Sequence, residues 1–224
     1  MTNKNTEPQL FKSLFHIIAF ILLFIVEQIP LSILALPKAS LGSSYQSYIK
    51  MAPIISLILM IIVGFILYFT YKRSKQFTTQ PFSIKTWITI IAGIVVALII
   101  NYGLIPFMRA QNTNVDTLNM IGQNSQIILI FSVLVTAPIF EELLFRGLIM
   151  NWFFVNRPMI SILISGLVFG FAHAPISSNT DWVYAISKIL LGLVLAIVYY
   201  KTKNIKASMT VHFLNNFLSI VLAM

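Results

Sequence analysis

Acidic side chains are rare in this chain, and two of them stand side by side. The 224 residues contain six acidic side chains: Glu7, Glu27, Asp116, Glu141, Glu142 and Asp181. Glu141 and Glu142 lie within an apolar stretch. A charged side chain at membrane depth costs about 3 kcal/mol or more without a partner, and such residues are functional candidates by default. The adjacent pair is therefore the first place to look for chemistry.

Helical spacing predicts different roles for the two carboxylates. Glu142 and Arg146 are four residues apart and would share a helix face, which predicts an ion pair that keeps Glu142 charged and structural. Glu141 is turned by about 100° from Glu142 and has no such cation. It is therefore the better candidate for a base that deprotonates water. The alternative is that both carboxylates serve packing alone.

The histidines and one asparagine extend this set. His173 follows Phe169 by four residues, and His212 precedes Asn216 by four. Each pair alone is typical of packing or of a hydrogen bond between membrane helices. Together they supply the groups that amide hydrolysis needs: a carboxylate and a His to activate water, and a second His with an Asn amide to hold the oxyanion. His16, near the start of the first apolar segment, is expected to be interfacial.

The sequence lacks the patterns of other hydrolase classes. His and Glu side chains can also bind Zn²⁺, but no His-Glu-x-x-His run is present. A Gly-x-Ser-x-Gly serine motif is absent too. With no Cys, the chain can form neither a disulfide nor a thiolate nucleophile. We therefore expect no cofactor, and zinc remains the open alternative.

Composition shows what surrounds these residues. Apolar residues make up 58% of the chain and charged residues 9%, and the mean hydropathy is +0.89. Soluble domains have about 25% charged residues. A soluble enzyme, a nucleic-acid-binding module and a disulfide-stapled secreted domain are therefore excluded. The net charge of +9 sits in short clusters between apolar runs, as in membrane proteins. We predict an all-α, polytopic bundle in the lipid bilayer, with no nucleic-acid partner.

Eight apolar segments approach the roughly 20 residues that span a bilayer. They are Leu14–Leu36, Pro53–Tyr71, Trp87–Met108, Ile127–Phe140, Leu143–Val155, Met159–Phe171, Trp182–Tyr200 and Ala207–Leu222. Pro138 lies near the end of the fourth. The fourth and fifth segments are either one long kinked helix or a helix followed by a partly inserted one. The sequence thus predicts seven or eight transmembrane helices.

Basic residues predict the orientation in the cell membrane. They gather in the loop at 71–85 and in the turn at 201–206, which places both, with the N-terminus, on the cytoplasmic side. On this topology His173 lies far along its helix from the inner surface, whereas His212 is only six residues beyond Lys206. The two can meet only if a helix is short, tilted or broken, or if the loop after His173 re-enters the membrane.

Three motifs resemble one known family. Glu141-Glu142-x-x-x-Arg146, Phe169-x-x-x-His173 and His212-x-x-x-Asn216 are similar, in order, to the motifs of the CAAX protease and bacteriocin-processing family. These Abi-type membrane proteins are related to the type II CAAX prenyl endopeptidase. The resemblance covers about residues 125–222. We therefore expect residues 121–224 to form the catalytic core and residues 1–120 to be variable leading helices, all within one membrane-embedded unit.

The resemblance implies an intramembrane endopeptidase that uses a glutamate-activated water without a covalent intermediate. In this family's pattern Glu141 is the general base, His173 helps to hold the water, and His212 with Asn216 forms the oxyanion site. Glu142 and Arg146 orient the motif, and Phe169 shapes the pocket. The implied partner is a peptide or protein substrate at the membrane, in bacteriocin self-immunity or peptide maturation. A non-catalytic immunity or interaction protein that keeps the fold is the alternative, and a small transporter or channel comes third.

Overall fold

The computed structural model describes residues 7–108, 113–178 and 180–222, and the regular elements in this part are all helical. The α-helices are α1 Glu7–Ser32, α2 Lys38–Leu41, α3 Tyr45–Ser74, α4 Ile84–Leu104, α5 Thr113–Phe131, α6 Ala137–Glu141, α7 Met150–Trp152, α8 Pro158–His173, α9 Trp182–Thr202 and α10 Ile205–Leu222. The 3-10 turns are η1 Ile33–Ala35, η2 Gly42–Ser44 and η3 Ile105–Phe107, and the π-helical turns are η4 Ser132–Thr136 and η5 Glu142–Ile149. The predicted all-α class is confirmed.

The described chain has six stretches that are long and apolar enough to cross a membrane. They are Phe11–Ala35, Lys38–Ser74, Ile84–Phe107, Asp116–Trp152, Trp182–Thr202 and Ile205–Leu222. The shorter helix α8 adds a further apolar segment of 16 residues. This is a multi-pass helical membrane protein, and six long spans with one short helix match the lower of the two expected numbers.

The fourth and fifth apolar segments form one long irregular helix, Asp116–Trp152. Of the two alternatives for the region around Pro138, one continuous helix is the one observed. The break in helical geometry lies before these segments, at Ser125, with φ −161° and ψ 89°. Further along, η4 ends immediately before the short helix that contains Pro138, and η5 follows Glu141. Because proline has no backbone N–H to donate, a change of hydrogen-bond register is expected near it.

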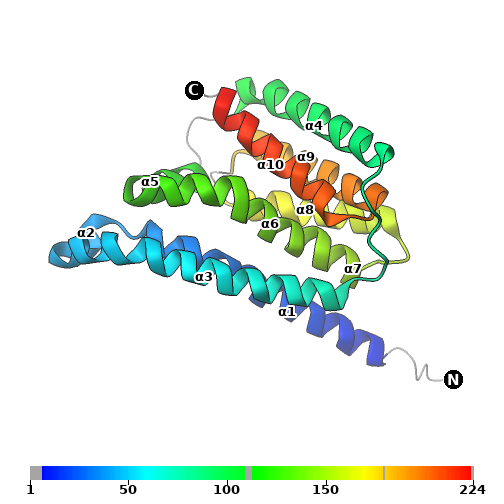
Figure 1. Cartoon of the computed structure of the whole chain (residues 1–224), viewed down its shortest axis with the longest axis horizontal. Helices are drawn as coiled ribbons and strands as arrows, with labels where there is room; N and C mark the ends of the chain where they lie inside the picture. The colour runs from blue at the N-terminus through cyan, green and yellow to red at the C-terminus, as the bar shows by residue number, and fades with distance from the viewer. Residues whose placement is uncertain (1–6, 109–112, 179, 223–224) are drawn as a thin grey trace.

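The two basic connections lie at the same end of the bundle as the start of α1. Figure 1 shows this start, the α3–α4 connection and the α9–α10 turn together at one end, with α2 and the end of α10 toward the other. This arrangement agrees with the orientation expected from the positions of Lys and Arg. The assignment of that end to the cytoplasm remains a prediction.

Helices α8 and α9 pack closely because glycines face the contact. A Cβ on Gly170 would lie 2.2 Å from Cγ1 and 2.8 Å from the backbone N of Ile189. A Cβ on Gly192 would lie 2.9 Å from the backbone O of Gly166. Small residues are what allows membrane helices to approach this closely, and here they fix the position of His173 at the end of α8.

We expect Gly170→Ala to destabilise the protein. The added methyl group would collide with the backbone of α9, and overpacking of this kind costs about 1–3 kcal/mol. Thermal unfolding in detergent should show a lower midpoint. Gly103→Ala is the matched control, because a Cβ there meets nothing within 4 Å. Equal midpoints for the two variants would contradict the close α8–α9 contact.

Candidate active site

Glu142 and Arg146 form a buried ion pair, as their spacing predicts. Arg146 Nη1 lies 2.8 Å from Glu142 Oε1, and both side chains are 0% exposed. Arg146 Nη2 donates to the backbone O of Gly192 in α9 at 3.0 Å. The guanidinium also lies over the ring of Phe169, 4.5 Å from its centroid. The pair therefore connects η5 to both α8 and α9.

His212 is joined to the same carboxylate. Its Nδ1 lies 3.1 Å from Glu142 Oε1, and its side chain is 4% exposed. Because an ionised carboxylate only accepts hydrogen bonds, Nδ1 carries the hydrogen. In the neutral ring Nε2 then has the lone pair, and it lies 3.8 Å from Glu141 Oε2. Glu142 thus sets the orientation of His212 toward Glu141.

His173 faces Glu141 from the end of α8. Its Nδ1 is 2.9 Å from the backbone O of Phe169, a carbonyl that can only accept, so Nδ1 is again the N–H. Its Nε2 lies 3.5 Å from Glu141 Oε2. The ring also packs on the side chain of Phe169, with 4.4 Å between centroids. Phe169 therefore supports His173 through both its backbone and its ring.

Glu141 Oε2 is the point on which the two imidazoles converge. Within the described part of the chain this buried oxygen has no hydrogen-bond partner. Its distances of 3.5 and 3.8 Å to the two Nε2 atoms exceed the roughly 2.7–3.2 Å of a direct N–H···O bond. Separations of this size suit a bridging water. In the tautomers inferred above, lone pairs of Glu141 Oε2, His173 Nε2 and His212 Nε2 face the same small volume. A hydrogen-bond donor or a cation is therefore favoured there.

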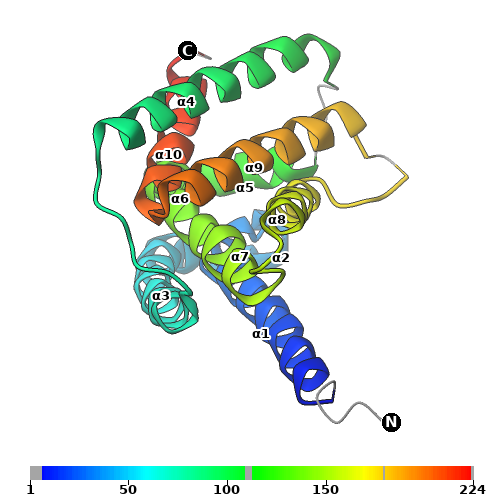
Figure 2. The ribbon, with the colours of Figure 1, turned by 90° about the vertical axis from the view of Figure 1, so that its right-hand side faces the viewer.

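The two histidines can meet because their helices differ in length and direction. Helix α8 has 16 residues, and His173 is its last. Figure 2 shows α8 nearly end-on, whereas α9 crosses the view obliquely. A short helix combined with tilted neighbours is among the solutions that the sequence left open.

Asn216 makes its hydrogen bonds away from Glu141. Its Nδ2 donates to the backbone O of Val133 in η4 at 2.9 Å, and its Oδ1 accepts from Asn215 Nδ2 at 3.2 Å. Asn101 of α4 in turn donates to Asn215 Oδ1 at 2.7 Å. Of the seven residues singled out from the sequence, Glu141, Glu142, Arg146, Phe169, His173 and His212 are thus in mutual contact, whereas Asn216 is bonded to η4.

Sequence reasoning did not identify Asn101 and Asn215 as part of this arrangement. The available signal was a polar amide in each of two apolar helices.

His16 lies outside the cluster and stacks on Trp152, with 4.6 Å between ring centroids. The donor set of Glu141, His173 and His212 also resembles a set of zinc ligands. Among the residues that the structure describes, however, no group of three His, Asp or Glu side chains is spaced to hold a metal ion.

Comparison with known proteins supports the family resemblance. Residues 123–218 match the family model of the type II CAAX prenyl endopeptidase Rce1-like proteins. This match confirms, for that segment, the resemblance drawn from the three motifs, and it includes the seven candidate residues.

A curated relative is the UPF0177 protein YvdC of Lactococcus lactis subsp. lactis (strain IL1403). It is 30% identical over 112 residues, which cover 50% of this chain and 41% of that protein. The match thus spans less than half of the relative's length. No solved structure matches the chain.

We expect Arg146→Met to destabilise the protein far more than the loss of an exposed charge. It would leave Glu142 buried without its cation, and breaking a buried ion pair costs about 3–5 kcal/mol. The double variant Glu142→Gln/Arg146→Met should regain much of that loss. Arg157→Met, at an exposed arginine, is the control. Urea unfolding measures all three, and an Arg146→Met protein as stable as the wild type would refute a structural role for the pair.

Proposed function

We propose that this protein is an intramembrane endopeptidase that hydrolyses a peptide bond with a water activated by Glu141. The observation that carries the proposal is the buried Oε2 of Glu141, which lacks a hydrogen-bond partner and faces the Nε2 atoms of His173 and His212. A buried polar atom without a partner needs a specific reason. A water held between a carboxylate and an imidazole supplies one, and it is also the arrangement that general-base catalysis requires.

The proposed reaction has one hydrolytic step and no acyl-enzyme. Glu141 takes a proton from the water while His173 Nε2 accepts its other hydrogen in a hydrogen bond. The oxygen attacks the substrate carbonyl, and the C=O electron pair moves onto its oxygen. Collapse of this intermediate breaks the C–N bond, and Glu141 returns its proton to the leaving nitrogen. The immediate products are a carboxylic acid and an amine, and transfer of the acid's proton to the amine then gives a carboxylate and an ammonium group.

The developing oxyanion needs hydrogen-bond donors. His212 can donate from Nε2 when its ring is doubly protonated, and the adjacent Glu142 carboxylate compensates that charge. Asn216 Nδ2 carries two hydrogens, and one of them is donated to the backbone O of Val133. We propose that the second turns toward the oxyanion when substrate binds, and that Asn101 and Asn215 hold the amide close to this position.

The proposed substrate is a peptide or protein in the membrane. The Rce1-like match supports a CAAX-type protease, which makes a prenylated C-terminal peptide one test substrate. A role in bacteriocin self-immunity or in peptide maturation is a second proposal, for which the natural test substrate is a short apolar peptide.

We expect Glu141→Gln to reduce cleavage by about 10²–10⁴-fold, the usual contribution of a general base. The carboxamide has nearly the same shape but accepts protons poorly, so the fold should be retained. The assay uses purified protein in liposomes with a farnesylated CAAX peptide and a panel of apolar peptides, and mass spectrometry identifies the products. Asp116→Asn, at an exposed carboxylate of α5, is the control.

Unchanged cleavage by Glu141→Gln would refute the catalytic role of this carboxylate. If cells expressing that variant stay fully protected against a peptide toxin that the wild type resists, the protein acts by binding instead. The non-catalytic immunity alternative would then be correct.

A second prediction separates water activation by side chains from zinc chemistry. Because side chains alone activate the water in the proposed mechanism, EDTA and 1,10-phenanthroline should leave the cleavage rate within about twofold of its initial value. Inactivation that is reversed by added Zn²⁺ would contradict the metal-free mechanism. Glu141, His173 and His212 would then be the candidate ligands.

A further inference from the structure

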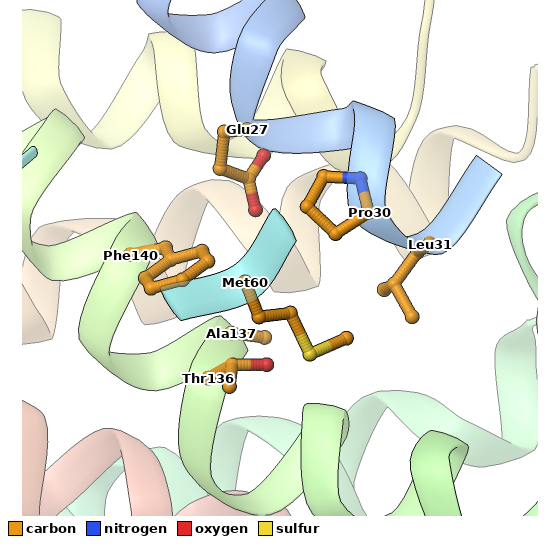
Figure 3. A pocket seen from close by; sticks show the side chains of 7 residues that line it. All are labelled: Glu27, Pro30, Leu31, Met60, Thr136, Ala137 and Phe140. Carbon is orange, nitrogen blue, oxygen red and sulfur yellow. The ribbon is translucent and has the colours of Figure 1, made fainter. Parts of the chain in front are cut away.

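A second acidic side chain lies close to the candidate active site and has no role in the mechanism above. Glu27 of α1 lines a small cleft. The other lining residues come from α1, α3, η4 and α6 and are Pro30, Leu31, Met60, Thr136, Ala137 and Phe140. Figure 3 shows the Glu27 carboxylate directed into the space that these side chains surround.

The Glu27 carboxylate has little to compensate its charge. Its hydrogen-bond partner is the amide of the adjacent Gln28. Among the described residues no Lys, Arg or His lies within ion-pair distance of it. An ionisable group at membrane depth requires a partner or a polar cavity, and the cleft beside Glu27 is where an external partner can enter.

The walls of the cleft suit a long apolar stem. Met60, Phe140 and Leu31 provide a thioether, an aromatic ring and an aliphatic chain. The Phe140 ring is held close to α3, since a Cβ on Gly64 would lie 3.2 Å from its Cε1. The free space beside the Glu27 carboxylate is about 10 Å³, enough for one water-sized group. It therefore fits the charged end of a side chain, with the stem lying along these walls.

The cleft is one helical turn from the proposed base. Ala137 lies four residues before Glu141 on α6, so both are on one face of that helix, about 6 Å apart along its axis. An extended peptide advances about 3.3–3.6 Å per residue. A side chain in the cleft would therefore belong to a residue within two positions of the scissile bond.

Charge favours a basic occupant. A cation beside Glu27 would supply the counter-charge that this carboxylate lacks among the described residues. A neutral or acidic side chain would not. A lysine or arginine offers the long stem that the apolar walls fit and the positive end that Glu27 lacks.

From this geometry we infer that the Glu27 cleft is a specificity site, which binds a lysine or arginine side chain of the substrate within two residues of the bond that is cut. The inference rests on the proposed peptidase function for its substrate. The presence of a cation-binding cleft does not depend on catalysis and can be tested without it.

The test measures binding to the Glu141→Gln protein in lipid nanodiscs, where no cleavage interferes. The two probes are apolar peptides of identical sequence except for one residue, lysine or its uncharged isostere norleucine. We expect the lysine peptide to bind about tenfold more tightly, as a charge-assisted hydrogen bond predicts. Adding Glu27→Gln should abolish the difference, and Glu27→Lys should favour a glutamate peptide instead. Asp116→Asn should leave the preference unchanged.

Cleavage by the protein with Glu141 intact gives the second readout. Products should show lysine or arginine within two residues of the cut, and Glu27→Gln should remove this enrichment while cleavage of norleucine peptides continues. Equal binding of the two probes, or a lysine preference that survives Glu27→Gln, would overturn the inference. Lysine-selective binding without any cleavage would uphold the cleft and refute the peptidase. If Glu27→Gln cannot be purified, Leu31→Trp tests the same cleft by filling it, with the same expected loss of preference.

Discussion

The buried ion pair between Glu142 and Arg146 is the interaction on which the arrangement of the site depends. One carboxylate oxygen receives both Arg146 Nη1 and His212 Nδ1, while Arg146 reaches the α9 backbone and the Phe169 ring. Charges inside a bilayer are costly, so these contacts cannot be exchanged for contacts with lipid. Elements that are distant in the chain are therefore held in one relative position. His212 is fixed directly, and His173 is fixed through Phe169.

This arrangement separates a carboxylate that is paired with a cation from the one proposed to be the base within two consecutive residues. Glu142 has its charge compensated on the side of Arg146. Glu141 is turned away and faces the Nε2 atoms of His173 and His212. Among the described residues no Lys or Arg lies within ion-pair distance of it, and its buried Oε2 has no hydrogen-bond partner. The adjacent pair is therefore more informative than either glutamate alone, because one member is paired with a cation and the other is not.

Parts of this structure could be predicted from the sequence because they depend on one helical turn. The ion pair follows from the spacing of Glu142 and Arg146, and an irregularity near Pro138 follows from its missing N–H, whereas the break at Ser125 does not. The approach of His173 and His212 to Glu141 depends on helix lengths and tilts that no local period encodes, and only the family resemblance predicted it. The hydrogen bond from Asn216 to the backbone O of Val133 could not be predicted either, because it depends on the position of η4. The boundary proposed near residue 120 likewise remains a prediction. Glu27 and Met60, both N-terminal to it, line the cleft beside α6.

The π-helical turns on either side of Glu141 have a consequence for sequence change. A π turn closes its hydrogen bonds one residue later than an α turn, so it accommodates one residue more than a regular helix of equal length. Removal of a single residue from η4 would let the helix return to regular α-helical bonding at little cost to its own backbone. Because the wide turn has already absorbed the extra residue, the segments before and after it would keep nearly the same rotation relative to each other, and Glu141 would keep its place opposite the histidines. A single-residue deletion in the regular helix α10 has no such turn to absorb it, and it would rotate the residues on one side by about 100° relative to those on the other. The helix that carries Glu141 thus tolerates a change of length at η4 that α10, which carries His212, does not.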